Sequence, residues 1–435
     1  MTGSRTTDAV SARETCERAL ARTEEPAVRS TMITVTSIRA RIEADRSDAR
    51  RRRHALRSPL DGVPIVWKDL FDVADTVTTC GSASMRDRAP ARSDGALVRR
   101  AADLGMVTVG KTNLSEFAFS GLGINQCFGT PLNPLDPDLV PGGSSAGAAV
   151  AVATGVAPLA VGTDTSGSVR VPAAFSGCVG YRASHHRYGR NDFRALSPTL
   201  DCVGLMARTV DDIRLLDRLL VGARDQPSPR PELRVVIPAG EWVDDCTPGV
   251  LASFGAAVDA LRDGGVDVVT TKLASMERAQ HLIDQHGTLV GADAYATYGG
   301  LVSSTGIEPA TKRRLARNAG ARQSIGPLLD EMPALRCRLG DELAGALLLC
   351  PTVRHEPPRI DDLRTSDATY DAFNASSLRT TMVLSFLGTC GVSLPVDGAD
   401  GGLPSGLLVS APTGHDDALL TVASRIGQLT RCSSG

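Results

Sequence analysis

Apolar residues occur along this chain both in short runs and at helical spacing, the pattern of an α/β protein. The segment LVRRAADLGMVTVGKTN predicts a helix near 95–104, a glycine turn and a short strand. The runs RVVIP (234–238) and VDVVT (266–270) predict two strands that flank a helix. Further strands are expected in DGVPIVWKDLFDV (61–73), at Leu159–Val161, in GALLLCPTV (345–353), and in a C-terminal segment of two strands around a Gly/Asp hairpin (390–412).

The remaining segments predict surface helices and one long irregular stretch. Residues 8–56 combine helical periodicity with many charges, and we expect an N-terminal helical segment (1–57) to pack on a core formed by 58–435. Residues 121–145 are dense in Gly, Pro and Asn, which is typical of an irregular segment that carries function. The small residues of 146–154 predict a tightly packed helix. No repeat, low-complexity linker or clean domain boundary is visible.

Composition argues for a globular protein without a charged macromolecular partner. A chain of 435 residues with 42% apolar residues can form two average domains or one large α/β domain. The formal net charge of −2 gives no reason to expect nucleic acid or an anionic membrane as partner. The arginine-rich run at 49–53 has acidic neighbours and predicts a solvated helix end.

Targeting and redox features point to the cytoplasm. The first ten residues lack an apolar core, so we expect no signal peptide. The longest apolar stretch, 146–161, consists of small residues and contains Pro158, which disfavours a membrane span. The ten cysteines are scattered, with no CxxC and no Cys/His cluster at zinc spacing. We therefore predict core cysteines in a reducing compartment, with no metal and no cofactor.

Lysine is rare in this chain, with four lysines (Lys68, Lys111, Lys272 and Lys312) against 43 arginines. Arginine stays protonated in proteins, whereas a buried lysine can lose its proton and act as a base. Each lysine is therefore a candidate for a role that arginine cannot fill.

Three segments together contain the groups that acyl transfer needs. They are VWKD at 66–69, PGGSSAG at 141–147 and GTDTSGS at 162–168. Acyl transfer requires a hydroxyl nucleophile, a base within hydrogen-bond reach and N–H donors for the oxyanion. These loops contain no histidine, so a lysine base with serines is the available solution. Taken alone, Ser144 and Ser168 would be read as turn or N-cap serines, and the three segments together overturn that interpretation.

Several ordered blocks resemble the amidase signature family, from about residue 58 to the end of the chain and most weakly between 220 and 380. The blocks are DGVPIVWKDLFDV, VGKTNLSEFAFS, FGTPLNP, VPGGSSAGAAVAVATGVAPLAVGTDTSGSVRVPAAFSGCVG, LSPTLDCVGLMARTVDD and GVSLPVDGADGGLPSGLLV. The resemblance implies a single large α/β domain with a mixed, mostly parallel twisted sheet that helices cover on both faces. It also implies an amidase that hydrolyses a carboxylic amide through an acyl-enzyme.

The resemblance implies a Ser–cis-Ser–Lys triad at three positions of this chain. Lys68 would be the base, Ser144 would sit on a cis peptide bond and relay protons, and Ser168 would be the nucleophile. The implied oxyanion hole consists of the backbone N–H groups of Thr165, Ser166, Gly167 and Ser168. Implied supporting residues are Ser145, as a hydrogen-bond partner of the site, and Asp164 and Arg170, which would brace the turn.

Other polar residues have simpler interpretations. Lys111 in GKTN is expected to be structural, because the glycine spacing of a P-loop is missing. Cys178 is expected in the core, and His185 and His186 are expected to be solvated loop residues.

The sequence departs from the family pattern at three positions near these motifs. Ser166 replaces a glycine before the nucleophile, and Ala146 replaces a glycine after the two serines. Both changes keep the backbone donors. Arg182 stands where the family commonly has lysine, which puts the shape of that loop in doubt.

The substrate pocket is expected to come from variable segments at roughly 125–128 and 275–360. Tyr295, Tyr298, Arg313, Arg314 and Arg317 could engage a polar or carboxylate-bearing substrate, or be exposed helix residues. The first hypothesis is an amidohydrolase for a small-molecule amide, with a homodimer left open. The alternatives are the A subunit of a tRNA-dependent amidotransferase, an acyltransferase, a hydrolase of carboxylated urea compounds, and a catalytically silent binding protein.

Overall fold

An eleven-stranded sheet forms the centre of the protein, in the order β1-β3-β2-β4-β6-β5-β10-β11-β9-β7-β8. The computed structural model describes residues 10–189, 192–222, 233–398 and 401–431. The strands are β1 (Met32–Val35), β2 (Pro64–Lys68), β3 (Val107–Thr112), β4 (Leu159–Asp164), β5 (Val179–Arg182), β6 (Cys202–Ala207), β7 (Arg234–Pro238), β8 (Asp267–Thr271), β9 (Leu347–Pro351), β10 (Cys390–Val396) and β11 (Ser405–Ala411).

Parallel and antiparallel pairing occupy different parts of this sheet. Strands β3, β2 and β4 pair in parallel, as do β9, β7 and β8, whereas β4-β6-β5-β10-β11-β9 and β1-β3 pair antiparallel. The expected single α/β domain with a mixed sheet is confirmed, but its mostly parallel pairing holds only for those two blocks. Crossover helices allow parallel pairing in the blocks, whereas the short connection between β10 and β11 permits only an antiparallel pair.

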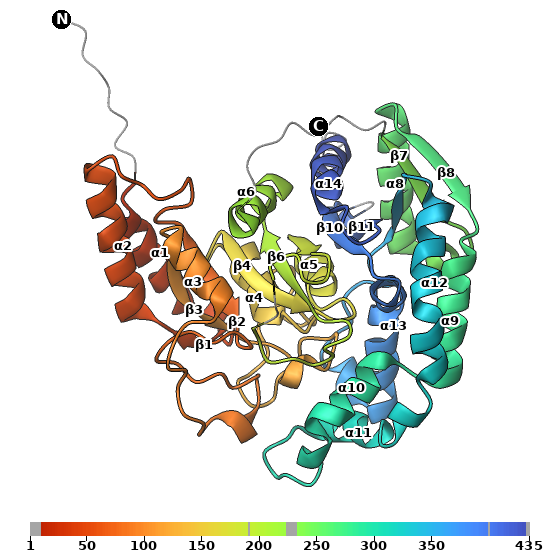
Figure 1. Ribbon diagram of the computed structural model, residues 1–435, viewed down its shortest axis with the longest axis horizontal. Coiled ribbons are helices and arrows are strands. Elements are labelled where there is room, and N and C mark those ends of the chain that lie inside the picture. The colour runs from red at the N-terminus through yellow and green to blue at the C-terminus, as the bar shows by residue number, and fades with distance from the viewer. Residues whose placement is uncertain (1–9, 190–191, 223–232, 399–400, 432–435) are drawn as a thin grey trace, which may run out of the picture.

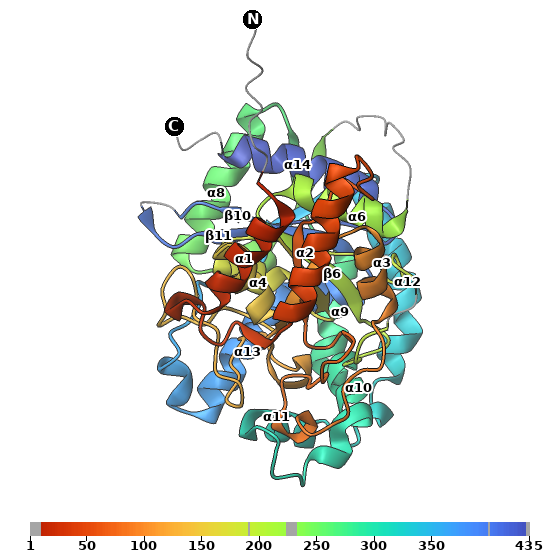
Figure 2. The same ribbon diagram turned by 90° about the vertical axis from the view of Figure 1, so that its left-hand side faces the viewer.

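Helices cover both faces of the sheet (Figure 1). They are α1 (Ala12–Thr23), α2 (Ser37–Arg52), α3 (Ala96–Asp103), α4 (Ala146–Ala153), α5 (Arg170–Ser176), α6 (Val210–Val221), α7 (Glu241–Asp244), α8 (Pro248–Asp263), α9 (Ala274–His286), α10 (Leu289–Tyr298), α11 (Pro309–Arg317), α12 (Gly326–Leu343), α13 (Asp367–Phe386) and α14 (Asp416–Arg431). Seen from the side, α1 and α2 lie in front of the sheet, with α4 behind them (Figure 2).

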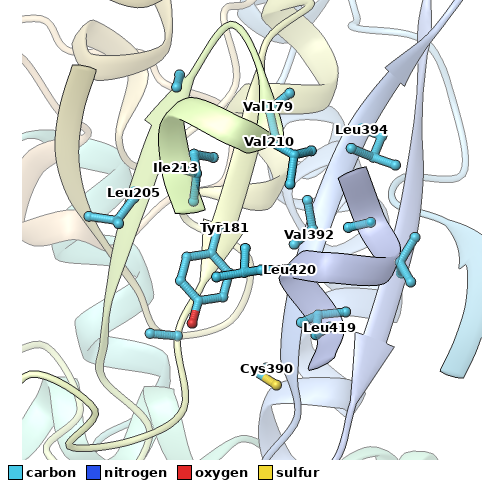
Figure 3. Packing of buried hydrophobic residues seen from close by; sticks show 14 of the residues in the cluster. Val179, Tyr181, Leu205, Val210, Ile213, Cys390, Val392, Leu394, Leu419 and Leu420 are labelled. Carbon is cyan, nitrogen blue, oxygen red and sulfur yellow. The ribbon is translucent and has the colours of Figure 1, made fainter. Parts of the chain in front are cut away.

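One face of the sheet packs against α3, α6, α8 and α14. Tyr181 and Leu205 from β5 and β6 meet Ile213 of α6, and Val392 of β10 meets Leu420 of α14 (Figure 3). These side chains are almost fully buried. The burial of such a cluster is a large contribution to folding, at roughly 25 cal/mol for each Å² of apolar surface removed from water.

The opposite face carries the helices that matter for the site. Ile65 and Trp67 of β2 belong to the first face, whereas Val66 packs with the small residues of α4 on the second. Because side chains alternate along a strand, Lys68 follows Val66 onto the α4 side. The sequence therefore directs a lysine toward the serine-containing loop that precedes α4.

Most elements predicted from the sequence are confirmed. Helix α3, helix α4 and strands β2, β3, β4, β7, β8, β9, β10 and β11 lie where the apolar pattern indicates, and 121–145 contains neither helix nor strand. The prediction missed β1, β5 and β6. Strand β1 lies inside the charged N-terminal stretch for which helices were expected, and β5 has only four residues, one of which is a glycine.

In the arginine-rich run at 49–53, residues 51–53 are exposed as expected, whereas Arg50 is half-buried and pairs with Asp61. The cysteines within the described residues are free thiols, and Cys178 is buried in the core. Over the same residues, no group of three or more His, Cys, Asp or Glu side chains is placed to hold a metal ion. The described helices also include none with the length and apolarity needed to cross a bilayer.

Candidate active site

Lys68 lies at the end of β2 and is fully buried. Its Nζ lies 2.7 Å from Ser144 Oγ, 2.9 Å from Thr163 Oγ1 and 3.3 Å from Thr163 O. Burial lowers the pKa of Lys68 to about 7, because the charged ammonium loses its water, although Asp164 and Asp201 oppose the change. A large fraction of this amine is therefore neutral at neutral pH, as a base requires.

The loop before α4 places Ser144 against this amine. The peptide bond between Gly143 and Ser144 is cis, and Gly143 N–H donates to Gly121 O at 2.7 Å. Ser145 links the loop to the next one, since its N–H donates to Ser168 O at 3.0 Å. Its hydroxyl donates to Thr163 O at 3.3 Å. Ser145 therefore joins the Ser144 loop to the segment that carries Ser168.

Ser168 lies in the turn between β4 and α5, two elements labelled near the centre of Figure 1. Asp164, the last residue of β4, accepts hydrogen bonds from the N–H groups of Gly167 at 2.8 Å and Val169 at 3.1 Å. Gly167 has a φ of 133°, and a side chain there would also clash with Thr381 Oγ1, so glycine is required. Ser166 has no positive φ, which explains why serine is accepted where the family commonly has glycine.

The backbone of this turn presents unused donors around Ser168. Among the described residues, the N–H groups of Thr165, Ser166 and Ser168 have no protein acceptor. Gly167, the fourth member of the expected oxyanion hole, is different because its N–H already donates to Asp164. The available donor set is therefore three N–H groups rather than four. Nor does any hydrogen bond in the described structure join the Ser144 and Ser168 hydroxyls.

A buried ion-pair cluster surrounds Asp164. Arg170 donates to its carboxylate through Nε at 3.0 Å and Nη2 at 2.9 Å, and Arg182 Nη1 lies 3.2 Å from Oδ1. These two arginines, together with the turn N–H groups, hold the pKa of Asp164 well below its usual range, against the effect of burial. Arg182, the replacement for the usual lysine, also donates to Leu200 O at 3.0 Å. Arg182 is the last residue of β5, and its guanidinium joins the end of this strand to Asp164 and to Leu200.

Replacing Asp164 with asparagine should destabilise the fold by about 3–5 kcal/mol, because two buried arginines then lose their counter-charge. Urea denaturation measures this change as a lower midpoint at constant slope. The matched control is Asp341→Asn on the exposed side of α12, for which we expect a change within about 0.5 kcal/mol. Equal stability of the two variants would contradict the structural role of Asp164.

Two further residues hold the turn, and sequence reasoning missed both. Asp201 accepts a hydrogen bond from Thr165 Oγ1 at 2.6 Å and from Leu196 N at 2.9 Å, and burial raises its pKa to about 6. Thr381, on α13, donates its hydroxyl to Ser166 O at 2.6 Å. Asp201 lies in the family-like segment LSPTLDCVGLMARTVDD (196–212), whereas nothing in the sequence around Thr381 indicates a role.

A cavity of about 340 Å³ opens over Ser168. Helices α10, α11 and α13 contribute nine of its eighteen lining residues, and α10 and α11 lie in the lower part of Figure 1. The lining residues include Ser166 and Ser168 from the turn, the apolar Leu196, Val290, Leu378 and Met382, and the polar Arg314 and Asn374. The expected region 275–360 contributes, but 125–128 does not line this cavity, and 118–120 and 371–382 take its place.

The remaining sequence candidates lie in structural or solvated positions. Lys111 is buried with its Nζ 2.5 Å from Asp69 Oδ1, as a structural residue would be. His185 and His186 are exposed and contact each other, with ring centroids 3.8 Å apart. Tyr298 donates its hydroxyl to Ala195 O at 2.8 Å and stacks on Phe117. Tyr295, the other tyrosine of α10, is half-buried and packs with the apolar side chains around this helix.

Comparison with known proteins gives the same family over nearly the whole chain. The family model described as "Amidase" matches residues 14–420. The chain is 35% identical over 385 residues to 2-amino-5-chloromuconic acid deaminase of Comamonas testosteroni, covering 85% of this chain and 82% of that protein. It is 33% identical over 412 residues to the A subunit of the glutamyl-tRNA(Gln) amidotransferase of Mycobacteroides abscessus, covering 84% and 83%.

A solved structure described as that of an amidase aligns with a TM-score of 0.86 and 26% identity, covering 98% of this chain and 97% of the other. The family match, the two relatives and this structure agree with the resemblance that the sequence blocks indicate. The chain belongs to the amidase family and is a hydrolase of that family.

Proposed function

We propose that this protein hydrolyses the C–N bond of a small carboxylic amide through an acyl-enzyme on Ser168, with Ser144 as proton relay and Lys68 as base. The observation that carries the proposal is the 2.7 Å hydrogen bond between the buried Lys68 amine and Ser144, beside a turn with three unused N–H donors. A lowered lysine pKa, a hydroxyl relay and a preorganised anion site are what a serine nucleophile needs.

In the proposed acylation step, neutral Lys68 takes the hydroxyl proton of Ser144 while Ser144 takes the proton of Ser168. Ser168 Oγ then attacks the amide carbonyl carbon, and the carbonyl oxygen becomes an oxyanion. The N–H groups of Thr165, Ser166 and Ser168 are the donors assigned to this oxyanion. The proton returns through Ser144 to the amide nitrogen, so that the C–N bond breaks and the amine or ammonia leaves.

Deacylation uses the same groups, with a water molecule in the place that Ser168 takes during acylation. A water molecule gives a proton through Ser144 to Lys68 and attacks the ester carbonyl. Collapse of the second oxyanion breaks the bond to Ser168 Oγ, and the proton returns to Ser168. The balance is one amide and one water consumed, with one acid and one amine formed.

The relatives support cleavage of a C–N bond and also supply a second candidate. One relative is named a deaminase, which agrees with release of ammonia. The similarity to amidotransferase A subunits covers 84% of this chain, so a role as one component of such an enzyme is the second candidate. That role requires partner proteins, whereas the first requires none.

A panel of aryl and alkyl primary amides tests the proposal on the purified chain. We expect ammonia and the carboxylic acid to appear in equal amounts without any added protein. Ammonia release that appears only after partner proteins are added would favour the amidotransferase role. Failure to release ammonia from any amide, alone or with partners, would contradict both candidates.

A further inference from the structure

Arg314 is a cationic group of the cavity that has no carboxylate partner among the described residues. It lies on α11, half-buried, and lines the same cavity as Ser168. Its guanidinium carbon is 4.2 Å from the centre of the Phe119 ring, a distance typical of a cation–π contact. Within the described residues, no carboxylate forms an ion pair with it and no acceptor receives a hydrogen bond from its side chain.

The neighbouring arginines of α11 differ from Arg314 in this respect. Arg313 Nη1 lies 2.8 Å from Asp367 Oδ1, and Arg317 Nη1 lies 2.5 Å from Asp371 Oδ2. Of the charged residues that line the cavity, Arg317 pairs with Asp371, which also receives Arg313 Nε at 3.3 Å from outside the cavity. Arg314 leaves the cavity with a net positive charge.

We propose that Arg314 binds a carboxylate of the substrate, so that the amide cleaved at Ser168 carries a carboxylate at its other end. This inference rests on the proposed function, because it places the reacting amide at Ser168. A guanidinium with free donors offers a carboxylate two parallel charge-assisted hydrogen bonds. Its contact with Phe119 holds the planar group in place before the substrate arrives, which reduces the entropy lost on binding.

The cavity wall also defines what lies between the two ends of this substrate. Val290, Leu378 and Met382 contribute apolar surface, which suits a hydrocarbon spacer. Asn374 adds a second polar contact. Its Oδ1 accepts from Ser120 Oγ at 3.0 Å and Gly121 N at 2.8 Å, whereas its Nδ2 has no acceptor among the described residues. The substrate class is therefore the monoamide of a dicarboxylic acid.

The test compares a monoamide of a dicarboxylic acid with the uncharged diamide of the same length, on wild type, Arg314→Gln, Arg314→Lys and Lys312→Gln. We expect wild type to prefer the monoamide, and Arg314→Gln to lower the monoamide-to-diamide ratio of kcat/KM by about tenfold or more, mainly through a higher KM. Arg314→Lys should keep part of the preference, because the charge remains. Lys312→Gln removes a charge from the same helix outside the cavity, and its ratio should equal that of wild type.

The inference is overturned if the diamide is hydrolysed as efficiently as the monoamide, or if Arg314→Gln and Lys312→Gln give the same ratio. These outcomes leave the proposed function intact, because both amides are still cleaved. If wild type cleaves neither amide and no other amide of the panel, the proposed function fails and the inference fails with it.

Discussion

Replacing Ser168 with alanine is expected to lower kcat/KM for the best amide substrate by about 10⁵-fold or more, which is the scale of losing a serine nucleophile. The variant keeps the backbone N–H and carbonyl groups of residue 168, so the bond from Ser145 N to Ser168 O is retained. Only the attacking oxygen is removed. Because Ser168 lies on the cavity wall and its hydroxyl has no partner in the described structure, the fold should be unaffected.

Steady-state kinetics with ammonia detection measures this loss, and circular dichroism checks that the variant remains folded. The matched control is Ser303→Ala, an exposed serine between α10 and α11, for which we expect wild-type activity. A folded Ser168→Ala variant with more than about 1% of wild-type kcat/KM would exclude Ser168 as the nucleophile.

The second large effect concerns Lys68. Replacing it with methionine, a side chain of similar length without a base, should lower kcat/KM by about 10²–10⁴-fold. Wild-type kcat/KM should rise with pH through about 7, because the pKa of Lys68 is lowered to about 7 and only its neutral form accepts a proton. Above that pH the profile should level off, and the rise should be absent in the variant.

The pH profiles of both proteins, measured in buffers of constant ionic strength, test this assignment. Lys272→Met serves as the control, since Lys272 is exposed after β8, and its profile should match that of wild type. Activity in Lys68→Met within a factor of ten of wild type, or the same rise near pH 7, would show that another group is the base.

The sequence predicts the sheet well where apolar runs are long and poorly where strands are short. Strands such as β7 and β9 are recognisable by their uninterrupted Val, Ile and Leu residues. By contrast, β5 has four residues with a glycine among them, and it is recognisable as a strand only from its neighbours in the sheet. Pairing direction depends on which strands become neighbours, which is why the antiparallel centre was not expected.

The site shows the same division between local motif and spatial arrangement. Lys68, Ser144 and Ser168 follow from motifs, and the structure joins Lys68 directly to Ser144. The hydrogen bond from Gly167 N–H to the Asp164 carboxylate depends on the conformation of the turn, so it could not be predicted from the residue pattern. Thr381 reaches the turn from a helix more than 200 residues further along the chain, so only the fold brings it there.

Mass spectrometry after labelling with a fluorophosphonate, a reagent that phosphonylates activated serines, tests the central role of Ser168 most directly. We predict a single adduct on the peptide that contains Ser168, no adduct in Ser168→Ala, and slower labelling in Lys68→Met. An adduct on another serine, or equal labelling of the wild type and Ser168→Ala, would contradict the account.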